Sequence, residues 1–253
     1  MGKNKLKKFS DMETFDHVFQ CSYNELAQGE LFPLKGCWHT QFFQNNNPIV
    51  LELGCGKGEY TVELAQRFPD KNYIGIDIKG ARMWTGAKLS AEQGLHNVAF
   101  IRTGINAIHH FFATNEVAEI WITFADPQMK KVNKRLTSTS FLSLYQQFLI
   151  AEGKINLKTD SNFLFTYTQA LAEVNQLPIY TTTRDLYQTH PNDETLAIKT
   201  YYEKQWISRG LTIKYLQFAL PQTIKLIEPN IEIPLDEYRS FSRQKRSELK
   251  ICT

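Results

Sequence analysis

A short apolar run that ends in three closely spaced glycines constrains this chain more than any other feature. Residues 49–53 read Ile-Val-Leu-Glu-Leu, and glycines follow at positions 54, 56 and 58. Residues 59–68 then have the apolar spacing of a helix, so the segment predicts a strand, a tight loop and a helix. Glycines in such a loop let a ligand approach the backbone, whose amides point outward at the start of the helix. The segment therefore predicts a ligand-binding loop in an α/β fold.

Strands and helices continue to alternate along the chain. Further strands are predicted at 72–77, 98–101, 119–124, 154–159, 179–183 and 213–220. Helices are predicted at 79–93, 105–113, 139–150 and 163–175, with one more that ends at Gly210. Strands separated by helices of this length imply right-handed crossovers. We therefore expect a Rossmann-like α/β domain over 48–220, with a mostly parallel seven-stranded sheet and helices on both faces, between an N-terminal extension (1–47) and a C-terminal arm (221–253).

Composition excludes several classes of protein. The net charge of the 253 residues is only +3, so any nucleic-acid surface must be local. No apolar run follows the N-terminal lysines, which argues against a signal peptide, and no stretch is apolar enough to span a bilayer. The four cysteines lack metal-site spacing and disulfide-framework density, and the histidines lack ligand partners. We expect a cytoplasmic protein that binds no metal and no membrane.

Acidic residues around the glycine loop bear on the identity of the ligand. A dinucleotide fingerprint needs a glycine where the chain has Glu59, and an acid there adds negative charge near a diphosphate. S-adenosylmethionine has no phosphate and carries a sulfonium and an amino group, so Glu52 is compatible with it. Asp77 ends the second strand, where an acid can accept both ribose hydroxyls. The loop favours S-adenosylmethionine; a dinucleotide, or a turn that only links strand to helix, is the alternative.

Cations follow an Asp-Pro turn at the end of the fourth predicted strand. Residues 124–135 read F-A-D-P-Q-M-K-K-V-N-K-R. Ligands of open α/β sheets bind at the carboxyl ends of the strands, so Asp126 is expected to face the cofactor cleft. The four cations that follow, a basic strip suited to phosphates, are Lys130, Lys131, Lys134 and Arg135. A solvated charge run is the alternative.

This segment resembles the signature of bacterial tRNA (guanine-N7-)-methyltransferases, F-P-D-P-W-P-K-K followed by a basic stretch. The matching positions are Phe124, Asp126, Pro127, Lys130 and Lys131, whereas Ala125, Gln128 and Met129 depart from it. Lys158-Thr159-Asp160 resembles the family's Thr-Asp pair after the fifth strand. Thr200-Tyr201-Tyr202-Glu203, followed by Gly210, resembles its T-K-F-E motif. The resemblance covers about residues 48–220.

The resemblance implies a class I methyltransferase that moves the methyl of S-adenosylmethionine to N7 of a variable-loop guanosine in tRNA and releases S-adenosylhomocysteine. The residues implied to bind the cofactor are Glu52, Gly54, Gly56, Gly58, Asp77, Gly104, Asn106 and Asp126. Asp126 is also the implied catalytic residue. The implied substrate contacts are Lys130, Asp160, Thr200, Tyr201, Tyr202 and Glu203, and the RNA-binding residues are Lys131, Lys134 and Arg135. Lysines of the N-terminus and the arm's Arg239, Arg243, Lys245 and Arg246 are further candidates for RNA binding.

Several alternatives stay open. The family usually has an acidic or amide residue at the position of Gly104, for the adenine amino group, and Asn106 is the candidate to replace it. Asp160 can also cap the helix that follows it, and T-x-x-E at 200–203 is also a capping box. A methyltransferase for a small molecule or a protein, or a tRNA-binding protein that has lost catalysis, are rival functions. The sequence is compatible with a monomer or a homodimer.

Overall fold

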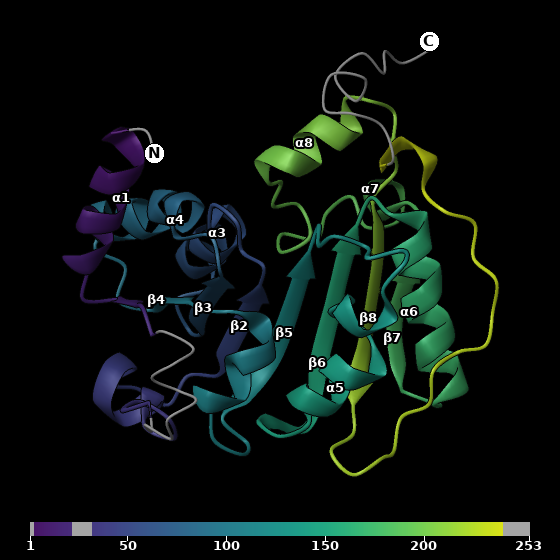
Figure 1. Ribbon diagram of the computed structural model, residues 1–253, viewed down its shortest axis with the longest axis horizontal. Coiled ribbons are helices and arrows are strands. Elements are labelled where there is room, and N and C mark those ends of the chain that lie inside the picture. The colour runs from purple at the N-terminus through teal and green to yellow at the C-terminus, as the bar shows by residue number, and fades with distance from the viewer. Residues whose placement is uncertain (1–2, 22–31, 240–253) are drawn as a thin grey trace.

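An eight-stranded sheet forms the centre of the computed structural model, which describes residues 3–21 and 32–239 (Figure 1). The strand order is β1-β4-β3-β2-β5-β6-β8-β7. The bounds are β1 Val18–Phe19, β2 Ile49–Leu53, β3 Asn72–Asp77, β4 Val98–Arg102, β5 Val117–Thr123, β6 Leu149–Thr159, β7 Ile179–Thr183 and β8 Lys214–Leu220. Strand β8 runs antiparallel to β6 and β7, and all other neighbouring pairs are parallel. The expected Rossmann-like fold is confirmed.

The sheet has one strand more than expected. The additional strand is β1, which comes from the N-terminal extension and pairs in parallel with β4 through Val18 and Phe19. Helix α1 (Lys3–Glu13) precedes it and packs against α4 (Gly80–Glu92). Two residues of strand are too short for an alternating pattern to be recognised. The extension is therefore continuous with the sheet and does not stand apart from it.

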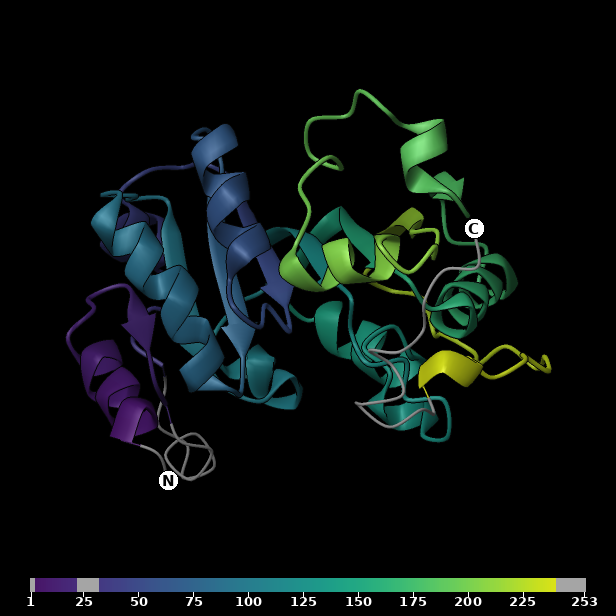
Figure 2. The same cartoon turned by 90° about the horizontal axis from the view of Figure 1, so that it is seen from above.

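Helices cover both faces of the sheet, because its central strands bury side chains on both sides. In β2 all five residues are buried, and Leu51 belongs to one apolar core while Val50 belongs to the other. Helices α5 (Thr139–Tyr145) and α6 (Asn162–Val174) contribute to the first core, and α3 (Glu59–Arg67), α4 and α7 (Leu186–Thr189) to the second (Figure 2). The remaining helical segments are η1 (Trp38–Phe43), η2 (Ile105–His110), η3 (Val132–Lys134), α8 (Tyr201–Ile207) and η4 (Glu237–Arg239). None of the helices in the described ranges is both long and apolar enough to cross a membrane.

Two predicted helices differ from the observed elements. The helix expected at 139–150 ends at Tyr145, and β6 begins at Leu149 instead of Lys154. The first part of β6 is irregular, since Glu152 has φ +58° and its partner strand β5 shifts register. The segment predicted as a helix at 105–113 is a tight 3-10 turn over 105–110.

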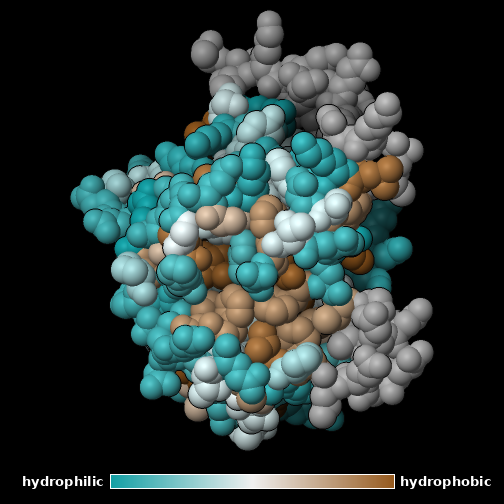
Figure 3. Space-filling model, turned by 90° about the vertical axis from the view of Figure 1, so that its left-hand side faces the viewer, coloured by the Kyte–Doolittle hydropathy of each residue, from teal (hydrophilic) through white to brown (hydrophobic). Residues whose placement is uncertain are grey.

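Figure 3 faces the β1 end of the sheet, where apolar surface gathers near the middle of the view. A hollow of about 440 Å³ between η1 and the end of α4 is lined in part by Phe42, Leu95 and Val98. The sheet order separates β1 from β5 by three strands, so this end of the sheet is remote from the loop that carries Asp126.

The C-terminal arm begins at the opposite end of the sheet from α8 and returns along the outer side of α6 (Figure 1). Ile224, Leu226 and Ile233 pack against the first core. The arm reaches the carboxyl ends of the parallel strands at η4. Its basic residues Arg243, Lys245 and Arg246 lie outside the described residues.

Candidate active site

The glycine loop lies at the carboxyl end of β2, beside the carboxyl ends of β3 and β5. Gly54, Gly56 and Gly58 all have positive φ, at +77°, +58° and +71°. A Cβ at Gly58 would come within 2.7 Å of the Phe100 ring, so only glycine fits at the start of α3. The predicted strand, loop and helix are therefore present, and the three glycines lie together at the edge where ligands of this fold class bind.

Asp77 connects the ends of β3 and β2. Its Oδ2 accepts a hydrogen bond from the Gly56 amide at 3.0 Å, and its Oδ1 accepts one from the Lys79 amide at 2.7 Å. The carboxylate is half-buried between the two loops. Asp77 thus orders the glycine loop and keeps part of its own surface at the site.

Glu52 lies beneath the glycine loop and is only 3% exposed. Its Oε2 accepts a hydrogen bond from the Thr61 amide at 2.9 Å, and its Oε1 accepts one from the Thr123 hydroxyl at 2.6 Å. Burial raises the pKa of this carboxyl to about 7, although the hydrogen bonds act in the opposite direction. Glu52 therefore connects β2, α3 and β5, and the cofactor contact that the resemblance implies for it stays a prediction.

Gly104 and Asn106 lie in the wall of a pocket of about 490 Å³ beyond the ends of β3 and β4. A Cβ on Gly104 would lie 2.6 Å from Asn106 Oδ1, so the Asn106 amide occupies the space of the missing side chain. The other lining residues are Gln20, Cys21, Ile78, Arg102, Thr103 and Ala107. Gln20 and Cys21 come from the N-terminal extension, and no sequence signal marked them.

Asp126 is exposed in the loop after β5. Its Oδ1 accepts a hydrogen bond from the Gln128 amide at 2.9 Å, which closes a turn around Pro127. Phe124 and Gln128 have φ of +52° and +47°, a left-handed conformation that non-glycine residues adopt at a cost. The loop therefore presents the Asp126 carboxylate at the carboxyl end of β5, and its role at the reaction centre stays a prediction.

The basic strip separates into two parts. Lys130, Lys131 and Lys134 are exposed. Arg135 is 5% exposed, and its guanidinium donates to the carbonyls of Gln128 and Met129 at 3.2 and 2.9 Å. The same group lies 4.7 and 4.4 Å from the ring centroids of two aromatic residues of α6, Phe163 and Tyr167. Arg135 therefore holds the loop against α6, and an RNA contact by its guanidinium would require it to leave these partners.

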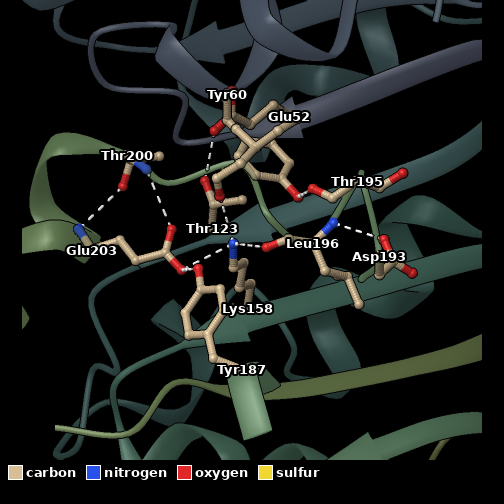
Figure 4. A network of polar contacts seen from close by, with 11 residues as sticks. Glu52, Tyr60, Thr123, Lys158, Tyr187, Asp193, Thr195, Leu196, Thr200 and Glu203 are labelled. Atoms are coloured by element: carbon tan, nitrogen blue, oxygen red, sulfur yellow. Dashed lines mark hydrogen bonds and ion pairs between the residues drawn. The ribbon is translucent and has the colours of Figure 1, made fainter. Parts of the chain in front are cut away.

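The Thr200–Glu203 motif begins α8 and forms the capping box that the T-x-x-E pattern allows. Glu203 is fully buried and pairs with the buried Lys158 of β6 at 2.9 Å (Figure 4). Lys158 also donates to the carbonyls of Leu196 and Ile198, at 2.9 and 2.7 Å. Burial lowers the pKa of Lys158, an effect that Glu203 opposes. Thr200 and Glu203 therefore stabilise the start of α8. A direct substrate contact by the buried Glu203 requires that its side chain move.

Tyr201 and Tyr202, in the same motif, are exposed. The Tyr201 amide donates to Glu59 Oε2 at 3.0 Å, and Lys57 Nζ lies 4.1 Å from the centroid of the Tyr201 ring. The start of α8 is thus joined to the glycine loop and the first turn of α3. Both tyrosines stay available to a ligand that approaches from this side.

Asp160 ends β6 and has no exposed surface. Its Oδ2 accepts a hydrogen bond from the Tyr238 hydroxyl at 2.7 Å. Ser161, and not Asp160, caps α6: its hydroxyl accepts from the Leu164 amide. The capping alternative for Asp160 is therefore wrong, and a residue of the C-terminal arm covers its carboxylate.

Comparison with known proteins agrees with this arrangement. A model of a family described as a putative methyltransferase matches residues 46–216. The tRNA (guanine-N(7)-)-methyltransferase of Bacteroides fragilis is 59% identical over 250 residues, which are 99% of each chain. The enzyme of that name from Porphyromonas gingivalis is 61% identical over 240 residues, 94% of this chain and 98% of the relative. The chain belongs to the tRNA (guanine-N(7)-)-methyltransferase family. This confirms the resemblance carried by the three motifs.

Solved structures of methyltransferases share the fold of this family member. An antibiotic-related methyltransferase superposes with a TM-score of 0.55 at 18% identity, over 75% of this chain and 96% of the other. The 16S rRNA methyltransferase KamB gives a TM-score of 0.56 at 12% identity, over 76% and 95% of the two chains. At such identities the likeness establishes the fold alone.

Sequence reasoning missed several residues around the site. The sequence analysis gave no role to Lys158 of the Lys-Thr-Asp motif, although a lysine in a run of buried strand residues indicates a buried ion pair. Asp236 and Tyr238 lie in the arm, which has no periodic pattern. Within residues 3–21 and 32–239 there is no group of three or more histidines, cysteines or acids that could hold a metal ion.

Proposed function

We propose that this chain transfers the methyl group of S-adenosylmethionine to N7 of a variable-loop guanosine in tRNA, in the cytoplasm. The observation that carries the proposal is the arrangement at the carboxyl ends of β2 to β5. The glycine loop, Asp77 and the Asn106 pocket lie on one side of this edge. The exposed Asp126 and its lysines lie on the other. A cofactor and an acceptor can therefore meet at one edge of the sheet.

The residues present fit S-adenosylmethionine. The half-buried Asp77 carboxylate suits the ribose hydroxyls, and the Asn106 amide, held where a side chain of Gly104 would lie, suits the adenine edge. The glycine loop leaves room for the methionine portion. When bound, the cofactor supplies an electrophilic methyl group on its sulfonium. Glu52 supports the loop from below through Thr61 and Thr123.

Guanine N7 has a lone pair and no proton, so the acceptor needs no general base. The protein must instead align the base and relieve the positive charge that grows on the purine, effects worth several kcal/mol. Asp126 suits this role because its carboxylate is exposed and its orientation is fixed by the Gln128 amide. It can accept hydrogen bonds from the guanine N1 and N2 donors.

RNA binding is assigned to the exposed cations and aromatic rings near Asp126. Lys130, Lys131 and Lys134 can contact phosphates, and Tyr201 and Tyr202 offer exposed rings for an unstacked nucleoside. We withdraw Arg135 from this set because its guanidinium is buried in the loop.

Label transfer distinguishes this function from its two rivals. The protein is incubated with methyl-labelled S-adenosylmethionine and unmodified tRNA. One half of the reaction is then treated with ribonuclease, and both halves are precipitated. We expect label that ribonuclease releases. Precipitated label that resists ribonuclease would indicate a protein acceptor, and a labelled product that stays in solution without ribonuclease would indicate a small-molecule acceptor. Binding of tRNA without label, together with no cofactor binding in calorimetry, would indicate a binding protein.

A further inference from the structure

The C-terminal arm is attached to the domain by specific contacts along its path back to the site. Gln146 donates to the carbonyl of Pro221 at 2.7 Å, and Asn175 exchanges two hydrogen bonds with the backbone of Ile227. Glu228 accepts hydrogen bonds from the Thr139 hydroxyl and the Tyr167 hydroxyl, both at 2.6 Å. These contacts lead the arm to the acceptor side of the site.

Asp236 fixes the end of this path. It is buried at the start of α6, where Oδ1 accepts a hydrogen bond from the Phe163 amide at 3.1 Å and Oδ2 accepts one from the Ser161 hydroxyl. Its own amide lies 3.2 Å from Met129 Sδ, in the loop that carries Asp126. The arm therefore joins the Asp126 loop to the start of α6, and it places Tyr238 two residues further on.

Tyr238 covers Asp160. Its hydroxyl donates to Asp160 Oδ2 at 2.7 Å, and its ring lies edge-on to Trp206 of α8 at 5.5 Å between centroids. Asp160 has no exposed surface, whereas Tyr238 is partly exposed. A base that is to reach the Asp160 carboxylate must therefore displace the tyrosine hydroxyl.

We propose that Tyr238 is a specificity-determining residue for the acceptor, because its hydroxyl holds the position on Asp160 that a guanine N–H donor takes. The inference rests on the proposed function and on the substrate contact that the family resemblance implies for Asp160, which would share the guanine N1–H and N2–H donors with Asp126. Guanine offers N1–H and N2–H donors that replace the lost hydrogen bond. Adenine in the same pose has no hydrogen on N1 and no amino group on C2, since its one amino group is on C6, and so it does not replace the hydrogen bond that Tyr238 gives to the buried carboxylate. Guanine thus displaces the tyrosine, and adenine does not.

Kinetics of Tyr238→Phe test this competition. The variant keeps the ring contact with Trp206 and loses the hydroxyl, so the free protein no longer satisfies Asp160 through this group. We expect the KM for tRNA to fall roughly tenfold, the size of a hydrogen bond to a charged group. The kcat and the Kd for the cofactor should stay within about twofold of the wild-type values, as expected for a substitution that affects neither step. Tyr180→Phe, at an exposed tyrosine of β7, is the matched control and should leave all three unchanged.

Amide hydrogen exchange of residues 235–238 tests the displacement without reference to activity. We expect exchange to rise when tRNA with the variable-loop guanosine is added, and to stay at the free value when adenosine replaces it. Absence of 7-methylguanosine with the wild-type protein would remove the proposed function alone. An unchanged or raised KM for Tyr238→Phe would overturn the inference, and so would arm exchange that responds equally to both tRNAs. A raised KM is the result expected if Tyr238 instead positions Asp160 for substrate binding.

Discussion

Lys158 and Glu203 form an ion pair in which neither side chain is exposed to solvent. The pair connects the carboxyl end of β6 to the first turn of α8, and the same ammonium holds the carbonyls of Leu196 and Ile198. The segment that carries the exposed Tyr201 and Tyr202 is therefore anchored from beneath. The buried half of the motif sets the position of the half that faces the ligand.

Removal of Lys158 should destabilise the protein strongly. Lys158→Met leaves the Glu203 carboxylate buried without its cation, which is expected to lower the free energy of unfolding by about 3–5 kcal/mol. The double variant Lys158→Met with Glu203→Leu should recover part of this loss. Urea unfolding measures both, with the exposed Lys154→Met of the same strand as control. A single variant as stable as the control would contradict the role of the pair.

Stability should depend on pH through Glu52. Below about pH 4.5 this carboxyl is protonated in both the folded and the unfolded chain. Burial raises its folded pKa from 4.5 to about 7, so over that interval the unfolded chain loses the proton first and the free energy of unfolding falls. The total for this group is about 3 kcal/mol. Glu52→Gln cannot ionise and should flatten that part of the profile in urea unfolding; parallel profiles would show that the pKa is not raised.

Asn106 should bind the cofactor in place of a side chain at position 104. Asn106→Ala is expected to weaken S-adenosylmethionine binding about tenfold in calorimetry, the loss of one or two hydrogen bonds. Gly104→Asp alone should also weaken binding, since its Cβ would meet Asn106 Oδ1. Gly104→Asp combined with Asn106→Ala should restore binding toward the wild-type value. Equal affinity for all four proteins would place the adenine elsewhere.

The two parts of the basic strip should respond differently to salt. Lys131→Ala and Lys134→Ala are each expected to weaken tRNA binding and to reduce the slope of log affinity against log salt by about 1. Arg135→Lys should leave the slope unchanged and lower the free energy of unfolding by about 2 kcal/mol, because it loses the stacking on α6 and the paired carbonyl contacts. Filter binding over a salt series and urea unfolding separate these effects. A change in the salt dependence of tRNA binding for Arg135→Lys would indicate that Arg135 contacts the RNA.

The fold could be predicted from the sequence where the apolar residues have a clear periodicity and the residue composition clearly favours a strand or a helix. The strands 49–53, 72–77 and 179–183 have the predicted bounds, because each is a β-rich run with turn residues on both sides. The edge strand β1 could not be found, since two residues carry no period and their partner β4 is about eighty residues away. The early start of β6 was missed because its first residues are exposed and irregular.

Site residues were predictable in type and less so in exposure. Asp126 and Asp77 lie where strand ends predict them, since topology alone brings those ends together. The burial of Arg135 and Glu203 depends on partners distant in sequence, namely the rings of α6 and Lys158. Tyr238 comes from an arm without a pattern, so only the folded chain brings it to Asp160.

Nucleoside analysis of tRNA treated with the protein and S-adenosylmethionine tests the central claim most directly. Two transcripts are compared, identical except for guanosine or adenosine at the variable-loop position, with wild-type protein, Asp126→Ala and Asp70→Ala as an exposed control. We predict 7-methylguanosine only in the guanosine transcript, with wild type and Asp70→Ala, and none with Asp126→Ala, whose stability should match the control. Equal 7-methylguanosine in both transcripts, or full activity of Asp126→Ala, would contradict the account.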